Sequence, residues 1–245
     1  MALSQEFEKV GNWFFQWRSY LPLLLLILFL LALKDFSYLT HQKNINRLWE
    51  LFCLGISSSG LVIRILTVGY VPRGTSGRNT KKQVADTLNT TGMYSVVRHP
   101  LYVGNFLMWL GISLVFHLWW FTLLIGLIFW VYYEKIMFAE EEFLKKQFGD
   151  QFLAWADKTP PFLPNFSHWL PPEMTFSIKS ALKREYASFF AMIAIFTILM
   201  VLCNLRVDKT FSLDPMWTAI FLGSLLFYLM VRFLKKKTHF LDDDR

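Results

Sequence analysis

Two apolar runs with almost no link between them decide the fold class of this chain: residues 101–138 read LYVGNFLMWLGISLVFHLWWFTLLIGLIFWVYYEKIMF. Only His117 to Trp120 are available to turn the chain between the runs. A helix needs about 20 apolar residues to cross about 30 Å of hydrocarbon, and each run approaches or exceeds that length. We therefore predict a tight helical hairpin in a membrane, with both outer ends on the same membrane face.

The rest of the chain also has the composition of a membrane protein. Of its 245 residues 54% are hydrophobic, whereas soluble domains average about 45–50% apolar residues. We predict an all-α, polytopic membrane helix bundle of about six segments, with a cofactor pocket on its cytoplasmic face. The first and third segments are shorter than the usual length of about 20 residues. The predicted segments are Tyr20–Leu33, Leu48–Val71, Leu101–His117, Leu118–Phe138, Ala187–Leu205 and Met216–Leu234.

Lysine and arginine residues indicate the orientation, because cytoplasmic loops carry more of them. With a cytoplasmic N-terminus, that side carries 17 lysine and arginine residues and the other side carries five. We therefore predict that both termini and two long loops, residues 72–100 and 139–186, are cytoplasmic. In a bacterium the protein would then lie in the inner membrane. The net charge of +7 suits anionic lipid head groups. We exclude nucleic acid as a partner, since the charges are spread through loops beside the membrane.

Three ranges divide the chain by predicted role. Residues 1–71 form the first two membrane segments, residues 72–164 the catalytic core, and residues 165–245 a linker and the last two segments. No small-residue cleavage site follows the first apolar run, so we expect that run to be retained. Cys53 and Cys203 fall inside apolar runs, where a thiol usually packs as a small hydrophobic group. We predict neither a disulfide nor a metal site.

Polar residues precede the first helix of the hairpin. Pro100 suits the first turn of a helix, because it lacks the backbone N–H that would be unpaired there. Arg98 and His99 then lie at the helix start, and Tyr102 lies one turn in, on the face of His99. Gly104 lets another backbone or a flat ligand approach closely. As an alternative, these residues only anchor the helix at the membrane boundary.

An acidic cluster follows the second helix of the hairpin. Glu140, Glu141 and Glu142 are consecutive and come directly after a membrane segment. Two lysines that follow can offset two of these charges at a spacing of four residues, which is the pattern of a solvated amphipathic helix. A ligand cation can offset them as well. The hairpin brings the acidic cluster to the membrane face that carries the first polar cluster.

Together the two clusters suit a zwitterionic, partly flat ligand that also bears a cation. S-adenosylmethionine has this character. Its ammonium and sulfonium suit carboxylates and aromatic faces, its carboxylate suits arginine, and its adenine suits stacking. The residues are compatible with such a ligand.

Two motifs can be read together: Gly92, Tyr94 and Arg98-His99-Pro100-Leu101-Tyr102-Val103-Gly104 form the first, and Glu140-Glu141, Leu144 and Phe148-Gly149 form the second. The pair resembles the integral-membrane methyltransferases of the isoprenylcysteine carboxyl methyltransferase and phospholipid methyltransferase superfamily. The resemblance covers roughly residues 92–164. In that family the hairpin and the cytoplasmic segment after it enclose S-adenosylmethionine, while a lipid substrate enters laterally from the bilayer.

This resemblance implies an S-adenosylmethionine-dependent methyltransferase acting on a membrane lipid or lipidated substrate. Glu142 falls on a position that the family pattern leaves free. Phe152 and Trp155 stand where relatives commonly have tyrosines, which keeps the aromatic bulk and loses two hydroxyls. The expected catalytic residues are His99 and Arg98, and the expected cofactor-binding residues are Arg98, His99, Tyr102, Gly104, Glu140 and Glu141.

A basic loop precedes the first motif. Residues 71–83 read VPRGTSGRNTKKQ, and their glycines, hydroxyls and cations can hold a phosphate. The loop lacks the spacing of a Walker motif. Arg64 lies inside a membrane segment nearby, where a charge costs about 2.5–3.5 kcal/mol at the centre and usually has a partner or a task. A solvated loop at an anionic membrane is the alternative. The expected substrate-binding residues are Arg64, Arg73, Ser76, Arg78 and Asn79.

No dedicated general base is evident, which favours O-methylation of a phosphate or carboxylate that is already anionic. N-methylation of a phosphatidylethanolamine-type amine is an alternative, for which His99 or a glutamate would have to take a proton. An NADPH-dependent membrane sterol-type reductase is another, although adjacent carboxylates would repel a 2′-phosphate. A non-catalytic lipid-binding membrane scaffold is the alternative from a different class.

Overall fold

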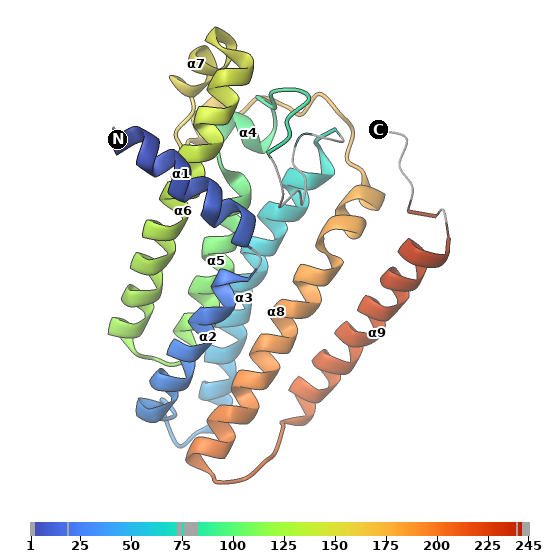
Figure 1. Cartoon of the computed structure of the whole chain (residues 1–245). Coiled ribbons are helices and arrows are strands. Elements are labelled where there is room, and N and C mark those ends of the chain that lie inside the picture. Colours follow the sequence, from blue (N-terminus) through green and yellow to red (C-terminus); the bar gives the residue numbers. More distant parts are fainter. Residues whose placement is uncertain (1–2, 19, 73–74, 76–82, 239, 242–245) are drawn as a thin grey trace.

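The computed structural model describes residues 3–18, 20–72, 75, 83–238 and 240–241, and within them it contains helices and no strand (Figure 1). The prediction of an all-α bundle is confirmed. The α-helices are α1 (Leu3–Trp17), α2 (Leu21–Ala32), α3 (Lys43–Gly69), α4 (Met93–Val96), α5 (Pro100–Leu114), α6 (Trp119–Phe148), α7 (Asp150–Ala156), α8 (Ile178–Val207) and α9 (Pro215–Lys237), and two 3-10 turns are η1 (Leu33–Asp35) and η2 (Phe166–His168).

Six apolar helices correspond to the six predicted segments. Four of them, α3, α6, α8 and α9, are long and apolar enough to cross a membrane. The third predicted segment is the 15-residue helix α5, and the first is the 12-residue helix α2, which is about 18 Å long. Both segments that the sequence marks as short are therefore short in the structure.

The predicted hairpin is formed by α5 and α6 (Figure 1). His117 turns the chain between them with a φ of 58°, in the left-handed region that non-glycine residues rarely adopt. α6 then runs as one helix through the acidic cluster to Phe148, and Gly149 ends it with a φ of 52°. The outer ends of the hairpin thus lie at the same end of the bundle, as the short link requires.

Glycines let α3 and α5 approach closely in the centre of the bundle. A Cβ added at Gly60 would lie 2.3 Å from the backbone oxygen of Gly104, and one added at Gly111 would lie 2.4 Å from that of Cys53. Beside this contact, buried aromatic side chains that include Phe116, Phe196 and Trp217 fill the core. Cys53 and Cys203 are free thiols buried in the same core, as predicted.

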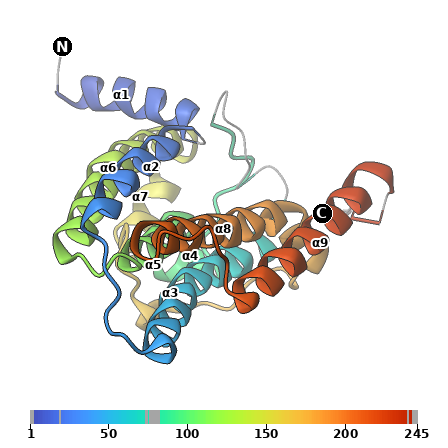
Figure 2. The same cartoon turned by 90° about the horizontal axis from the view of Figure 1, so that it is seen from below.

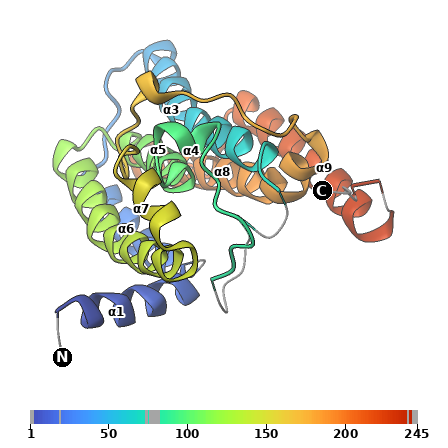
Figure 3. The same ribbon diagram turned by 90° about the horizontal axis from the view of Figure 1, so that it is seen from above.

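α9 and α1 lie at the two edges of the bundle. α9 packs against α8, and in Figure 2 it lies at the margin opposite α1. α1 was not predicted from the sequence. It runs obliquely across the upper end of the bundle in Figure 1 and packs along α6 in Figure 3. Its exposed face carries Trp13 and Trp17, a residue type that is enriched where a protein meets a membrane surface.

α8 begins at Ile178, nine positions before the predicted start of the fifth segment. The Ser177 side chain accepts a hydrogen bond from the backbone N–H of Ser180 (3.1 Å) and caps the helix. Good helix formers such as Lys183 and Arg184 fill its first turns. These polar turns project toward the end of the bundle where α5 begins and α6 ends, and they contribute to the site described next.

Candidate cofactor site

A cavity of about 490 Å³ lies at the polar end of the bundle, within the usual range of about 300–1,000 Å³ for small-molecule sites. Its walls come from α1, α3, α5, α6, α8 and the segment that precedes α4. All three ranges into which the sequence divides the chain therefore contribute to it. The predicted core supplies the most residues, while Arg18 and Glu185 come from the flanking ranges.

The proline-rich segment after α7 fixes the start of α5. The backbone N–H of Arg98 donates to the oxygen of Pro160 (2.8 Å), and that of His99 donates to the oxygen of Pro161 (3.3 Å). Pro100 is the first residue of α5, as predicted. The His99 backbone oxygen accepts from the N–H of Tyr102 (3.0 Å). The first motif is thus held from outside the helix by the loop that follows the second motif.

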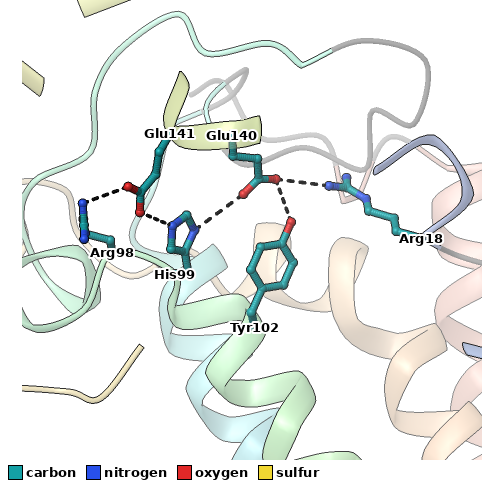
Figure 4. A network of polar contacts seen from close by, with 6 residues as sticks. All are labelled: Arg18, Arg98, His99, Tyr102, Glu140 and Glu141. Atoms are coloured by element: carbon teal, nitrogen blue, oxygen red, sulfur yellow. Dashed lines mark hydrogen bonds and ion pairs between the residues drawn. The ribbon is translucent and has the colours of Figure 1, made fainter. Parts of the chain in front are cut away.

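Arg98 and His99 both bind Glu141 (Figure 4). The Arg98 Nη1 atom lies 2.9 Å from Oε2 of Glu141, and the His99 Nε2 atom lies 2.8 Å from Oε1. The side chain of Arg98 is 16% exposed and that of His99 is 6% exposed, so both charges lie in a largely desolvated place and need this partner. The two predicted motifs are therefore joined directly.

Glu140 has different partners, although it is adjacent in the sequence. Its Oε1 atom accepts a hydrogen bond from the Tyr102 hydroxyl (2.7 Å) and lies 3.5 Å from Nη1 of Arg18. Its Oε2 atom lies 3.6 Å from Nδ1 of His99. Of the two carboxylates, Glu140 lines the cavity and Glu141 does not. Glu140 is therefore the carboxylate placed to meet a ligand, and Glu141 holds the cations beside it.

Both ring nitrogens of His99 face carboxylates. Burial lowers the pKa of His99, but hydrogen bonds and charge from Glu140 and Glu141 outweigh it, so the pKa is raised above its ordinary value. A doubly protonated imidazolium would donate to Glu141 from Nε2 and would face Glu140 with Nδ1. Both ring nitrogens are thus turned toward carboxylates of the protein.

One donor at the edge of this network is unused. Within the described residues, the buried Nε atom of Arg98 has no hydrogen-bond partner, and buried polar groups usually have one. Arg98 also lines the cavity. A ligand carboxylate would satisfy this donor, and a ligand cation would suit Glu140. These residues fit the amino-acid part of S-adenosylmethionine.

A second charged group in the cavity wall joins α3 and α8. Arg64 binds Glu185 through two contacts, Nε to Oε2 (2.9 Å) and Nη2 to Oε1 (2.7 Å). Its Nη1 atom donates to the side-chain oxygen of Asn105 (2.6 Å), whose own amide donates to the hydroxyl of Tyr133 (3.2 Å). All four side chains line the cavity. The charge predicted to need a partner or a task inside the membrane therefore has a partner.

Sequence reasoning missed Glu185, Asn105 and Arg18 as site residues. A signal for Glu185 was available: Arg64 inside an apolar run requires a counter-charge, and Glu185 lies two positions before the fifth apolar run. The sequence holds no comparable signal for Arg18, because α1 was not predicted.

The remaining predicted site residues fall into two groups. Gly104 lies in the contact between α3 and α5: a Cβ there would be 2.6 Å from Cγ of Arg64 and from the oxygen of Gly60. Arg64 fills the space beside Gly104, and Gly104 is not among the residues that line the cavity, so its assignment to the cofactor stays a prediction. Arg73, Ser76, Arg78 and Asn79 lie outside the described residues, and their assignment to the substrate stays a prediction.

The two aromatic residues that stand in place of the expected tyrosines have separate roles. Trp155 lines the cavity, and its Nε1 donates to the backbone oxygen of Tyr94 (3.0 Å). Phe152 is buried and lies against Trp155, with ring centroids 5.8 Å apart. One of the two thus offers an aromatic surface to a ligand, and the other supports it.

Comparisons with known proteins agree with this arrangement. A sequence model of the phospholipid methyltransferase family matches residues 60–151. The protein-S-isoprenylcysteine O-methyltransferase of Schizosaccharomyces pombe is 34% identical over 85 residues, which cover 35% of this chain and 36% of that protein. No solved structure matches the chain significantly.

Two bacterial proteins are also similar. The cobalt-zinc-cadmium resistance protein CzcN of Cupriavidus metallidurans is 38% identical over 82 residues, or 34% of this chain and 38% of that protein. The nickel-cobalt-cadmium resistance protein NccN of Alcaligenes xylosoxydans xylosoxydans is 34% identical over 92 residues, or 38% of this chain and 40% of that protein. The chain thus matches well under half of the length of each of these relatives.

The family match includes Arg64, Arg98, His99, Tyr102, Glu140 and Glu141, and therefore the centre of the site. Residues 60–151 of this chain are therefore similar to the integral-membrane methyltransferases, the group to which the phospholipid methyltransferase family and the isoprenylcysteine O-methyltransferase belong.

Proposed function

We propose that the protein is an S-adenosylmethionine-dependent methyltransferase that acts on a membrane lipid or a lipidated substrate. One observation carries this proposal: Glu140 lines a cavity beside His99 and Tyr102, while Arg98 lines the same cavity and is held by the neighbouring Glu141. The bound cofactor supplies an activated methyl group on a sulfonium. The residues of this chain hold that cofactor, with Glu140 beside its ammonium and Arg98 beside its carboxylate.

The acceptor is proposed to be an oxygen that is already anionic, such as a phosphate or a carboxylate. Methyl transfer to such an oxygen forms a C–O bond, breaks the C–S bond and releases no proton. This suits His99, whose two nitrogens both face carboxylates. An amine acceptor would have to release a proton, and because both nitrogens of His99 already face carboxylates, a glutamate such as Glu140 would have to receive it. Among the alternatives drawn from the sequence, O-methylation therefore has the best support.

The acceptor is proposed to reach the cavity from the membrane beside α3 and α8. Arg184 and Ser188 line that wall beside the ion pair of Arg64 and Glu185, so the guanidinium of Arg184 is the charge that an anionic head group would meet there. Two described residues of the basic loop, Thr75 and Gln83, also line the cavity. This supports the prediction that Arg73, Ser76, Arg78 and Asn79, which lie close to them in the sequence, bind the substrate. The cavity and both termini are proposed to be cytoplasmic, because the lysine and arginine count favours that side.

The proposal is tested by titrating S-adenosylhomocysteine into the purified protein in detergent by isothermal calorimetry. We expect binding to the unaltered protein, and Glu140→Ala and Arg98→Ala are each expected to weaken it by about tenfold, or about 1.4 kcal/mol. Glu142→Ala is the matched control, since Glu142 is a neighbouring carboxylate that does not line the cavity. Unchanged affinity in both site variants would contradict the assignment of the site.

A further inference from the structure

Arg18 reaches the centre of the site from a part of the chain that the family match does not include. The match begins at residue 60, whereas Arg18 directly follows α1. Its Nη1 atom lies 3.5 Å from Oε1 of Glu140, the same oxygen that accepts from the hydroxyl of Tyr102. Figure 4 shows Arg18 approaching Glu140 from the side opposite Arg98. Arg18 and Glu140 both line the cavity.

Several contacts fix α1 in the position that presents Arg18. A Cβ added at Gly11 would lie 2.1 Å from the backbone oxygen of Lys135, so the two helices touch at their backbones. The hydroxyl of Tyr132 donates to the backbone oxygen of Phe14 (3.2 Å). Phe15 is 5% exposed and packs in the cluster that contains Tyr102. α1 is therefore part of the packed structure around the site.

Phe15 also orients the arginine directly. The guanidinium carbon of Arg18 lies 4.0 Å from the centroid of the Phe15 ring, within the range of a cation–π contact. The Arg18 side chain is 19% exposed, so its charge is largely removed from water. A desolvated charge that is stacked on a buried ring and aimed into a cavity is held in one place by the fold.

The charges around the cavity then alternate. In Figure 4 the order of the linked groups is Arg98, Glu141, His99, Glu140 and Arg18, so Glu140 has His99 on one side and Arg18 on the other. A guanidinium presents five N–H donors in a planar fork, so one arginine can contact two anions at once. A ligand with an ammonium next to a carboxylate would match this order, with the ammonium at Glu140 and the carboxylate at a neighbouring arginine such as Arg18.

We propose that Arg18 is a cofactor-site residue that, together with Glu140, recognises the charged amino-acid end of an S-adenosylmethionine-type ligand. The inference rests on the proposed function, and it adds a ligand contact from α1. The competing interpretation is that Arg18 only docks α1 onto α6. In that case replacing Arg18 would weaken the binding of every ligand of the cavity to the same extent.

Two ligands separate these interpretations. S-adenosylhomocysteine carries the amino-acid end, and 5′-methylthioadenosine keeps the adenosine and the thioether but lacks that end. Both are titrated by calorimetry into the full-length protein in lipid nanodiscs. We expect Arg18→Gln to weaken binding of S-adenosylhomocysteine by about tenfold, while binding of 5′-methylthioadenosine stays the same. Arg18→Lys keeps the positive charge, and we expect it to reduce the affinity for S-adenosylhomocysteine less than Arg18→Gln does.

Lys135→Gln is the matched control. Lys135 is also a cation at the contact between α1 and α6, with its Nζ 4.4 Å from the centroid of Phe7, but it does not line the cavity. We expect it to leave both affinities unchanged. Three results would overturn the inference about Arg18 and leave the proposed function standing. The first is that Arg18→Gln weakens binding of both ligands equally, and the second is that Arg18→Gln and Lys135→Gln weaken binding equally. The third is that Arg18→Gln leaves both affinities unchanged. Failure of the unaltered protein to bind S-adenosylhomocysteine would overturn the proposed function as well.

Discussion

Glu140 and Glu141 are adjacent on α6, yet their side chains make different contacts in the site. Glu141 accepts from both Arg98 (2.9 Å) and His99 (2.8 Å), while Glu140 lines the cavity. Successive residues of a helix point about 100° apart, so one carboxylate can face the cavity while the other faces the start of α5. One of the two glutamates thus lines the cavity, and the other binds the basic residues at the start of α5.

Replacing these two glutamates one at a time should separate ligand binding from stability. Glu140→Gln is expected to weaken binding of S-adenosylhomocysteine with little change in Tm, because Glu140 is the carboxylate in the cavity wall. Glu141→Gln is expected to lower Tm as well, because it leaves Arg98 without the anion of its ion pair and His99 with Glu140 alone. Calorimetry and thermal unfolding of the same samples check both. A lower Tm for Glu140→Gln than for Glu141→Gln would contradict this division.

The pair of Arg64 and Glu185 should behave as a buried ion pair. Their side chains are 15% and 4% exposed. Arg64→Met and Glu185→Leu are each expected to destabilise the protein by about 3–5 kcal/mol, because each leaves one buried charge unpaired. The double variant should be more stable than either single variant, since it removes both charges. Thermal unfolding in detergent measures the stability of the two single variants and of the double variant. Additive losses would show that the two residues are not coupled.

Stability should depend on pH through His99. Since its pKa is raised in the folded protein, the stabilising contribution is fully present below the unfolded value of about 6.5 and is lost as pH rises through the folded value. The free energy of unfolding should then fall by at most about 1.4 kcal/mol per pH unit in that window. His99→Gln should remove this slope. His41→Gln is the control, since His41 is exposed, and it should retain the slope. Equal slopes in both variants would contradict the assigned state of His99.

Close approach of α3 and α5 should make Gly104 intolerant of a side chain. A Cβ at Gly104 would lie 2.6 Å from the backbone oxygen of Gly60, and overpacking of this kind costs about 1–3 kcal/mol. Gly104→Ala is therefore expected to lower Tm. Gly126→Ala is the matched control, because within the described residues no heavy atom lies within 4 Å of its added Cβ. Equal Tm values for the two variants would show that α3 and α5 do not touch as described.

The sequence predicts the hairpin and its polar ends because both depend on local information. The length of each apolar run and the four residues between them leave one arrangement for α5 and α6. That arrangement brings Arg98 and His99 to the acidic cluster. The sequence does not indicate which glutamate faces the cavity, because this depends on the rotation of α6 against α5. It suggests a ligand role for Gly104, and the structure shows Gly104 packed against Arg64.

The flanking parts of the site were not predictable in the same way. α1 is amphipathic and is not long enough or apolar enough to appear as a membrane segment. Its position is set by tertiary contacts such as that of Gly11 with Lys135. Glu185 precedes the fifth apolar run and joins the site only because α8 begins earlier than hydropathy suggests. Site residues that come from distant helices can be predicted only when the packing of those helices is known.

Methyl transfer itself tests the central claim most directly. The protein is placed in nanodiscs made from lipids of the cells that produce it and is incubated with S-adenosylmethionine carrying a labelled methyl group. Extracted lipids are then analysed by mass spectrometry, with Glu140→Gln as the control. We predict a lipid that gains one labelled methyl group on a phosphate or carboxylate oxygen, and that is absent from the control. Label on an amine would contradict the proposed acceptor, and no labelled lipid or lipidated molecule would contradict the proposed activity.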